Sequence, residues 1–223
     1  MGDPVAEAMK QFPIQEFVIE RDSRAAMRAC SFGVIGSSKS GKTTLIKYLL
    51  KHQFADDLKI FMTQSPQAEI YESIKKECAF APAYIPDIIK SCSQINKGTK
   101  NHYQFLVIVD DVVGVKNDQT MTKLLCLYRN HGISAIVGGQ DLTLLSATGR
   151  ANLNHIILLA QRTSNRVEDN VKHFLRGYFP RNLTMDERIE LYIRLTEDYC
   201  FLHIDALEGT MKRCRLKPSQ LVD

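Results

Sequence analysis

The stretch Gly36–Thr43, which reads GSSKSGKT, fits the pattern G-x-x-x-x-G-K-[ST] of a phosphate-binding loop without a mismatch. The two glycines let the backbone curl so that successive amides point at a β-phosphate, and the following helix adds its positive end. Lys42 then reaches the β- and γ-phosphates, while the Thr43 hydroxyl binds Mg²⁺. The sequence therefore predicts a nucleotide site formed by Gly36, Ser37, Ser38, Lys39, Ser40, Gly41, Lys42, Thr43 and Thr44.

A second stretch, FLVIVDD, ends in the carboxylates Asp110 and Asp111. It has the form of a Walker B strand, whose apolar residues are buried and whose acidic end lies beside the phosphate loop. Asp110 is expected to hold Mg²⁺ through water, together with Thr43, and Asp111 to orient or deprotonate the attacking water. ATP and Mg²⁺ are the predicted cofactors, and the division of roles between the two aspartates stays open.

A guanine-specific site is excluded by spacing. DVVG, from Asp111 to Gly114, resembles one GTPase motif and KND, from Lys116 to Asp118, resembles the end of another. In a GTPase these motifs belong to different strands, whereas here they lie almost on top of each other.

Gln140 follows the apolar run ISAIVGG. A strand inserted between the phosphate-loop and Walker B strands, tipped with a polar residue, is typical of ring-forming ATPases, where Gln140 would sense the γ-phosphate.

The elements that must position these residues alternate between strands and helices. Continuous apolar runs predict buried parallel strands at SFGVIG, 58–63, 105–109, 133–139 and 155–160, and YCFLHID with TMKRCRL predicts a closing hairpin. The predicted fold is α/β: a three-layer P-loop NTPase, RecA-like or ASCE, with a mostly parallel central sheet and a C-terminal β-hairpin. One ATPase domain is expected over 31–223, with 1–30 as a lead segment of the same domain.

Several boundaries follow from local signals. EFVIE, from Glu16 to Glu20, predicts a short strand, and Ser65 with Pro66 predicts a helix start. A capping box of Asn165 with Glu168 is expected to open a helix that Gly177 ends, and Thr184 with Glu187 is expected to open the last helix.

Composition bounds the class of protein. The chain has 223 residues, a net charge of +4 and a pI near 8.7, which permits contact with nucleic acid but does not argue for it. Its six cysteines include no C-x-x-C pair, so neither a zinc cage nor a disulfide framework is expected. The sequence shows no secretory signal and no apolar run of membrane-spanning length. We expect an intracellular, soluble protein.

The order of these motifs resembles the FtsK–HerA superfamily, and within it the poxvirus-type genome-packaging ATPase branch of large DNA viruses and virophages. The resemblance covers roughly Ser31 to Leu159 and rests on the phosphate loop, FLVIVDD, YRNHGISAIVGGQ and GRANLNHIILL. The branch's polar cluster before the sensor strand maps onto Arg129, Asn130 and His131, its sensor glutamine onto Gln140, and a later arginine with asparagine onto Arg150 and Asn152. Asp111 stands where the wider superfamily commonly has glutamate.

This resemblance implies an ATP-driven translocase that pumps double-stranded DNA into a preformed capsid. It implies a homo-oligomeric ring, pentameric or hexameric, in which a neighbour's arginine completes each ATP site. Arg150 is the first choice for that arginine and Arg129 the second, so the predicted catalytic set is Lys42, Asp111, Gln140, Arg150 and Arg129. The implied partners are DNA and a capsid or portal protein, with no membrane, and the implied location is the host cytoplasm or virus factory and the virion. Lys97, Lys100, His102 and the basic tail Met211–Lys217 are candidate DNA contacts.

Three other readings remain open at this point. A HerA-like helicase or conjugation-type coupling ATPase would use the same motifs. A P-loop kinase of a nucleotide or small metabolite would need an arginine-rich lid, for which the segment Gln161–Arg176 is the candidate. A scaffold gated by nucleotide would bind ATP and turn it over very slowly.

Overall fold

A computed structural model describes residues 3–19, 29–65 and 69–217 of the chain. The strands are β1 (Ile14–Glu16), β2 (Ser31–Ile35), β3 (Leu58–Thr63), β4 (Ala79–Ala81), β5 (Phe105–Asp110), β6 (Ile133–Gly139), β7 (His155–Leu158), β8 (Phe201–Asp205) and β9 (Thr210–Arg215). The helices are α1 (Pro4–Met9), α2 (Lys42–His52), α3 (Glu72–Glu77), α4 (Pro86–Gly98), α5 (Gln119–Cys126), α6 (Ala147–Ala151), α7 (Ser164–Tyr178) and α8 (Met185–Leu195), with 3₁₀ turns η2 (Glu69–Tyr71) and η3 (Tyr128–His131).

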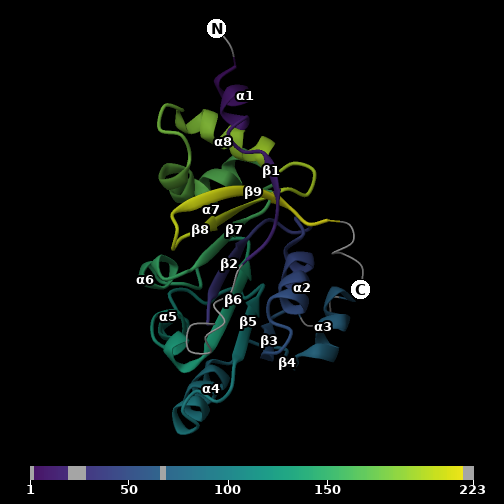
Figure 1. Cartoon of the computed structure of the whole chain (residues 1–223), viewed down its shortest axis with the longest axis vertical. Coiled ribbons are helices and arrows are strands. Elements are labelled where there is room, and N and C mark those ends of the chain that lie inside the picture. The colour runs from purple at the N-terminus through teal and green to yellow at the C-terminus, as the bar shows by residue number, and fades with distance from the viewer. Residues whose placement is uncertain (1–2, 20–28, 66–68, 218–223) are drawn as a thin grey trace.

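The strands form one nine-stranded sheet in the order β1-β9-β8-β7-β2-β6-β5-β3-β4 (Figure 1). Strands β2 to β7 pair in parallel, and β8 is antiparallel to both β7 and β9. The predicted mostly parallel sheet with a C-terminal hairpin is confirmed. Strand β6 lies between β2 and β5, as expected for a strand inserted between the phosphate loop and the Walker B carboxylates.

Two apolar cores cover the two faces of this sheet. Helix α2 packs on one face, where its Leu45 and Leu49 belong to the same apolar core as Phe32 of β2 and Ile108 of β5. Helices α5, α7 and α8 belong to the core of the other face. Figure 1 shows α2 and α3 on one side of the sheet and α5 to α7 on the other. Because the central strands are buried on both faces, their sequences are continuous apolar runs rather than alternating ones.

The start of α7 differs from the prediction. Thr163 is its N-cap, with an extended backbone and a hydroxyl that accepts from the Arg166 amide at 3.3 Å. The predicted capping box of Asn165 and Glu168 is therefore wrong, and Glu168 instead pairs with Lys172. The helix also continues past Gly177 to Tyr178. The capping box predicted at Thr184 and Glu187 is confirmed.

Other boundaries shift at the edges of the sheet. Strand β1 ends at Glu16, the residue where the predicted strand began, and Glu20 lies outside the described residues. The predicted run 155–160 ends as a strand at Leu158. Pro66, the expected helix start, also lies outside the described residues. The short elements β4 and α6 had no predicted counterpart, because three to five residues give too little periodicity to recognise.

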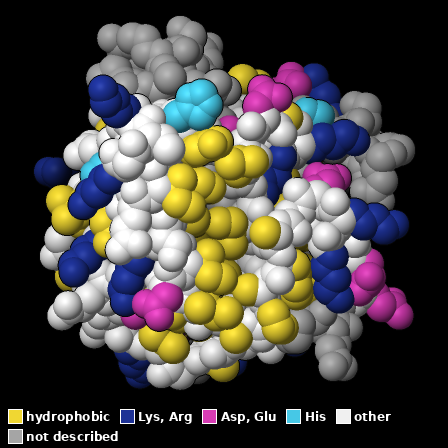
Figure 2. All heavy atoms as spheres, turned by 90° about the horizontal axis from the view of Figure 1, so that it is seen from below, with side chains coloured by type: hydrophobic (Ala, Val, Ile, Leu, Met, Phe, Trp, Pro, Cys, Tyr) yellow, Lys and Arg dark blue, Asp and Glu magenta, His cyan; other side chains and the backbone are white. Residues whose placement is uncertain are grey.

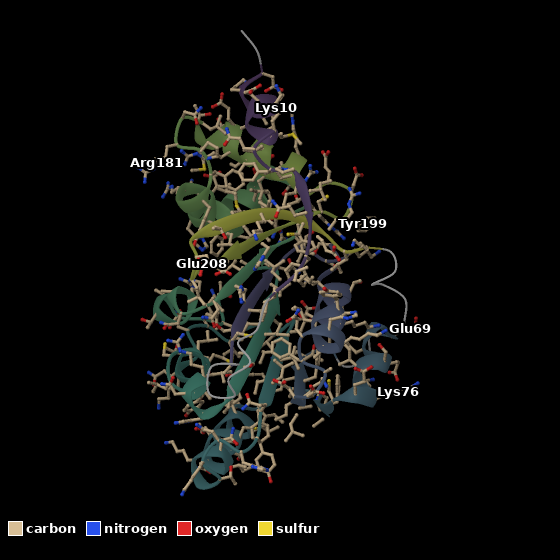
Figure 3. All side chains as sticks on the ribbon, in the orientation of Figure 1. Lys10, Glu69, Lys76, Arg181, Tyr199 and Glu208 are labelled. Atoms are coloured by element: carbon tan, nitrogen blue, oxygen red, sulfur yellow. The ribbon has the colours of Figure 1, made fainter. Side chains whose placement is uncertain are left out.

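The surface carries both charge and apolar patches. Figure 3 shows labelled charged side chains, including Lys10, Lys76 and Arg181, at the periphery of the ribbon. Figure 2, from below, shows a stripe of apolar side chains at the end of the molecule where Figure 1 places α4 and β4.

All six cysteines are free thiols. None of the described helices combines the length and the apolar character needed to cross a bilayer.

Two buried histidines join β7 to β8. Nδ1 of His155 lies 3.2 Å from Nε2 of His203. Phe17 packs edge-on against His203, and the ring of Phe32 is tilted by 31° against that of His155. Burial lowers the pKa of both rings, and repulsion from His155 helps to bring that of His203 to about 4. Asp205, on the same strand as His203, opposes the shift.

We predict that acid destabilises the protein through this pair. Because the folded pKa of His203 lies below the ordinary histidine value of 6.5, its contribution to stability is complete above pH 6.5 and is lost as the pH falls toward 4. One such group changes the free energy of unfolding by at most about 1.4 kcal/mol per pH unit. Denaturant unfolding at several pH values between 7.5 and 5 measures this pH dependence. The variant His203→Gln should give a shallower slope, and equal slopes in the two proteins would contradict the prediction.

Candidate nucleotide site

The phosphate loop connects β2 to α2 and depends on its two glycines. A Cβ added at Gly36 would lie 2.3 Å from Oγ of Ser40 and 2.9 Å from Cβ of Leu159, so the loop closes only around a glycine. Gly41 has a φ of 96° and forms the N-cap of α2, a backbone conformation that side chains disfavour. Lys39 also has a positive φ, of 64°. The loop is therefore curled as the motif predicts.

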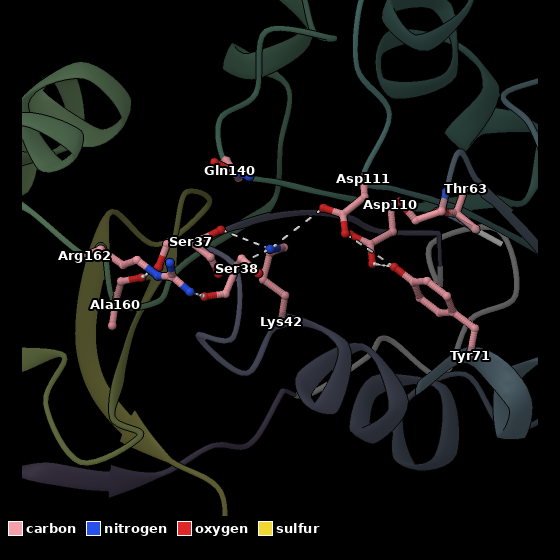
Figure 4. A network of polar contacts seen from close by, with 12 residues as sticks. Ser37, Ser38, Lys42, Thr63, Tyr71, Asp110, Asp111, Gln140, Ala160 and Arg162 are labelled. Carbon is pink, nitrogen blue, oxygen red and sulfur yellow. Dashed lines mark hydrogen bonds and ion pairs between the residues drawn. The ribbon is translucent and has the colours of Figure 1, made fainter. Parts of the chain in front are cut away.

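Backbone contacts fix this loop to the two strands that flank β2. The Gly36 amide donates to the Gly139 carbonyl at 3.1 Å, at the end of β6. Beyond β7, the Ala160 carbonyl accepts both the amide of Ser37 at 3.2 Å and its hydroxyl at 3.1 Å. Arg162 donates to the Ser38 carbonyl at 3.2 Å (Figure 4). Ser37 therefore has a structural role in the loop, whereas the buried Ser40 hydroxyl has no partner among the described residues.

Lys42 is held inside the loop that it serves. Only 7% of its side chain is exposed, and Nζ donates to the carbonyls of Gly36 at 3.1 Å and Ser37 at 3.4 Å. Nζ also lies 3.8 Å from Oδ1 of Asp111 (Figure 4). The ammonium group is thus placed between the phosphate loop and the Walker B carboxylates, where it can pair with a phosphate.

A pocket of about 620 Å³ opens over these groups. That volume lies within the range of small-molecule and cofactor sites. It collects residues from the phosphate loop, the ends of β3, β5 and β6, and η2. The lining residues are Ser38, Lys39, Gly41, Lys42, Thr43, Thr44, Gln64, Ser65, Tyr71, Asp111, Val113 and Gln140.

Asp110 lies behind this pocket and is fully buried. Its Oδ2 accepts a hydrogen bond of 2.9 Å from the Tyr71 hydroxyl, while Oδ1 has no partner among the described residues. Oδ1 lies over Gly138 of β6, where an added Cβ would be only 2.3 Å away. Burial, followed by repulsion from Asp111, raises the pKa of Asp110 to about 6. A buried carboxylate oxygen without a protein partner fits a hydrated Mg²⁺ ion, with Thr43 as the second predicted ligand.

Asp111 faces the pocket directly. Its backbone has a φ of 49°, a left-handed conformation that aspartate tolerates better than most residues. Its amide donates to the Gly138 carbonyl at 3.3 Å, and 38% of its side chain is exposed. This turn directs the carboxylate toward Lys42, so the two adjacent aspartates have different surroundings.

Gln140 follows β6 and lines the same pocket as Lys42 and Asp111. Its Oε1 accepts a hydrogen bond of 2.9 Å from Nη1 of Arg166 on α7. The sequence analysis did not single out Arg166 or Arg162, which both contact the rim of the pocket. Their only signal was membership of the arginine-containing segment considered as a kinase lid.

The two arginines predicted to act on a neighbour's nucleotide do not line this pocket. Nη1 of Arg150 donates to the Leu145 carbonyl at 2.7 Å, and its side chain borders a separate hollow of about 480 Å³ with Asp169 and His173. Arg129 lies in η3, before the amino end of β6, whereas Gln140 follows the carboxyl end. The length of β6, roughly 20 Å, separates Arg129 from the pocket of its own chain.

The candidate DNA contacts also lie elsewhere. Lys97, Lys100 and His102 precede the amino end of β5, at the opposite edge of the sheet from the pocket. The predicted basic tail is largely strand β9. Within it, Arg213 donates to the Leu195 carbonyl at 2.9 Å, and beyond it Lys217 pairs with Glu16 at 2.6 Å.

Tyr71, Gln64 and Val113 are pocket residues that the sequence analysis missed. The Val113 amide donates to Oε1 of Gln64 at 2.8 Å, which joins the segment after β3 to the segment after β5. None of the three belongs to a recognisable motif. Gln64 and Val113 come together because β3 and β5 are adjacent and parallel, whereas Tyr71 comes from η2.

Comparison with known proteins agrees with this arrangement. Residues 19–176 match the sequence model of the family described as Poxvirus A32 protein. Comparison with curated protein sequences gives no significant match.

Solved structures with the same fold include two viral packaging proteins. The DNA-packaging ATPase B204 from Sulfolobus Turreted Icosahedral Virus is 16% identical, with a TM-score of 0.60 over 84% of this chain and 98% of that one. B204 from Sulfolobus turreted icosahedral virus 2, in complex with AMPPCP, is 16% identical, with a TM-score of 0.57 over 85% and 98%. The pCW3 conjugation coupling protein TcpA, with ATPgS, is 14% identical, with a TM-score of 0.59 over 86% and 62%.

We predict that Gly138→Ala impairs nucleotide hydrolysis. The added Cβ would lie 2.3 Å from Oδ1 and 3.1 Å from Cγ of Asp110, so this carboxylate must move. Displacing a group of the reaction site by about 1 Å can lower the rate roughly 100-fold. Steady-state hydrolysis and a thermal melt measure the two effects separately. Gly177→Ala is the matched control, because a Cβ there meets nothing within 4 Å. Equal activity in the two variants would contradict the assigned role of Gly138.

Proposed function

The chain belongs to the poxvirus A32 protein family, and we propose that it hydrolyses ATP to move double-stranded DNA into a viral capsid. The observation that carries the proposal is the meeting of Lys42, Asp111 and Gln140 in one pocket, brought together by the insertion of β6 between β2 and β5. Family membership and the fold shared with the DNA-packaging ATPase B204 support the same function.

The chain's own groups suit the hydrolysis of a phosphoric anhydride. The amides of the phosphate loop and Lys42 bind the β- and γ-phosphates, while Thr43 and Asp110 hold Mg²⁺. The metal supplies positive charge that offsets the charge of the phosphates. Asp111 orients the attacking water and accepts its proton. The new bond joins this water's oxygen to the γ-phosphorus, and the bond to the bridging oxygen breaks, which releases ADP and phosphate.

A neighbouring subunit is proposed to complete the site. Among the described residues, the cationic side chains that line the pocket are the lysines Lys39 and Lys42, and Arg162 and Arg166 contact its rim. An arginine from the next protomer of a pentameric or hexameric ring would therefore add the charge that stabilises phosphoryl transfer. Arg150 is the first candidate and Arg129 the second. A capsid or portal protein, and action in the host cytoplasm or virus factory, belong to the same proposal.

The kinase alternative receives no support from the proposed lid segment. Residues 161–176 lie mostly in α7, whose side chains Val167, Val171 and Leu175 are buried in the core. A lid must move over its acceptor, whereas this helix is a fixed part of the fold. A coupling ATPase or helicase of the same superfamily remains the alternative that the DNA assay must separate.

The first test measures ATP hydrolysis with and without double-stranded DNA. We expect DNA to raise the rate, and Lys42→Ala to lower it by roughly 100-fold or more because a phosphate-binding charge is lost. Lys51→Ala is the control, since Lys51 lies at the other end of α2 and outside the pocket. Hydrolysis that persists in Lys42→Ala would place the nucleotide elsewhere. A rate that ignores DNA, or a phosphorylated metabolite, would contradict the translocase.

The second test asks whether Arg150 acts on a neighbour's nucleotide. Lys42→Ala subunits keep Arg150 but lack a working pocket, and Arg150→Ala subunits have the reverse defect. Mixing the two inactive proteins should restore part of the activity, because some interfaces then pair an intact pocket with an intact arginine. The same mixture made with Arg129→Ala tests the second candidate. Mixtures that stay inactive, or protein that stays monomeric with ATP and DNA, would contradict action between subunits.

A further inference from the structure

Tyr71 connects the Walker B carboxylates to a part of the fold that carries no nucleotide motif. It lies in η2, on the connection between β3 and β4, and only 2% of it is exposed. Its hydroxyl is 2.9 Å from Oδ2 of Asp110 and 3.5 Å from Oδ2 of Asp111. Figure 4 shows Tyr71 pointing toward both aspartates. One side chain therefore reaches both adjacent carboxylates.

The ring of Tyr71 is itself fixed. Its centroid lies 5.2 Å from that of Phe61 on β3, and Phe61 stacks on Phe80 of β4 at 5.7 Å. Because this aromatic packing and near-complete burial restrict the ring, the phenol can hold the position of a partner rather than follow it.

This contact determines which oxygen of Asp110 is left for a ligand. A phenol has one hydrogen to donate, and the distances assign it to Asp110. Oδ2 of Asp110 is thereby engaged, and Oδ1, over Gly138, is left without a protein partner. Without the phenol the carboxylate could rotate, and its repulsion from the adjacent Asp111 would favour other orientations.

We propose that Tyr71 is a positioning residue that holds Asp110 in the orientation required for Mg²⁺. This inference rests on the proposed ATPase function. Tyr71 acts through Asp110, because its hydroxyl already hydrogen-bonds to carboxylates. Mutating a residue that hydrogen-bonds to a metal ligand commonly lowers metal affinity or activity roughly 10- to 100-fold. The expected consequence of losing the hydroxyl is weaker Mg²⁺ binding, with the phosphate loop unaffected.

Tyr71→Phe is the test variant, because it removes one oxygen and keeps the packed ring. Tyr84→Phe is the matched control: the Tyr84 hydroxyl also donates to an aspartate, Asp118, at 2.6 Å, and neither residue lines the pocket. Two readouts are needed: binding of a fluorescent ATP analogue with Mg²⁺ or with EDTA, and the Mg²⁺ concentration that gives half-maximal ATP hydrolysis.

We expect Tyr71→Phe to raise the half-maximal Mg²⁺ concentration roughly 10-fold. It should also lose most of the gain in analogue affinity that Mg²⁺ gives, while binding in EDTA stays as in the wild type. Tyr84→Phe should match the wild type in both readouts. If Tyr71→Phe matches Tyr84→Phe, or loses binding equally in EDTA, the positioning role is wrong.

The result also separates this inference from the proposed function. A wild-type protein that binds the analogue but does not hydrolyse ATP contradicts the ATPase, while the binding readout still decides the role of Tyr71. A wild-type protein that does neither contradicts both. A wild-type protein that hydrolyses ATP, with no Mg²⁺ effect in Tyr71→Phe, contradicts the role of Tyr71 alone.

Discussion

Burying the Asp110 carboxylate is the interaction on which the rest of this site depends. A buried charge is costly unless hydrogen bonds or opposite charges compensate it. Here Tyr71 donates to one oxygen, Gly138 leaves room for the other, and Lys42 adds a positive charge nearby. These three groups come from different segments, so the position of one carboxylate constrains η2, β6 and α2 together. The compensation is incomplete because one oxygen keeps no partner among the described residues, which is the property expected of a metal site.

The neighbours of β2 impose a second constraint. The phosphate loop is fixed by carbonyls at the ends of β6 and β7, through Gly36 and Ser37. The same end of β6 carries Gln140 and faces Asp110. One strand therefore supports the loop, gives space to the carboxylate and presents the predicted sensor. A structural change at the end of β6 would therefore displace the phosphate loop, Asp110 and Gln140 together.

The sequence predicted the parts of the structure that have strong local signals. The phosphate loop has a specific pattern, and buried parallel strands such as β5 and β6 are continuous apolar runs, so the fold class and the insertion of β6 between β2 and β5 could be predicted. Contacts between segments that are far apart in the sequence could not be predicted in this way. Tyr71 and Arg166 reach the pocket only through the packing of η2 and α7, and no pattern around them reports that. The cap of α7 was misplaced because Thr163 and Asn165 both suit the position, and the backbone geometry that decides between them is not visible in composition.

The order in which strands join the sheet has a consequence for synthesis on the ribosome. Strand β1 pairs with β9, whose partner residues lie almost at the other end of the described chain. The phosphate loop is complete only when β6 and then Ala160 have emerged, because their carbonyls hold it. A nascent chain therefore contains the phosphate-loop sequence long before the strands that fix the loop's conformation have been synthesised. Such long-range pairing slows folding. The contacts that fix the loop can therefore form only after residue 160 has been synthesised.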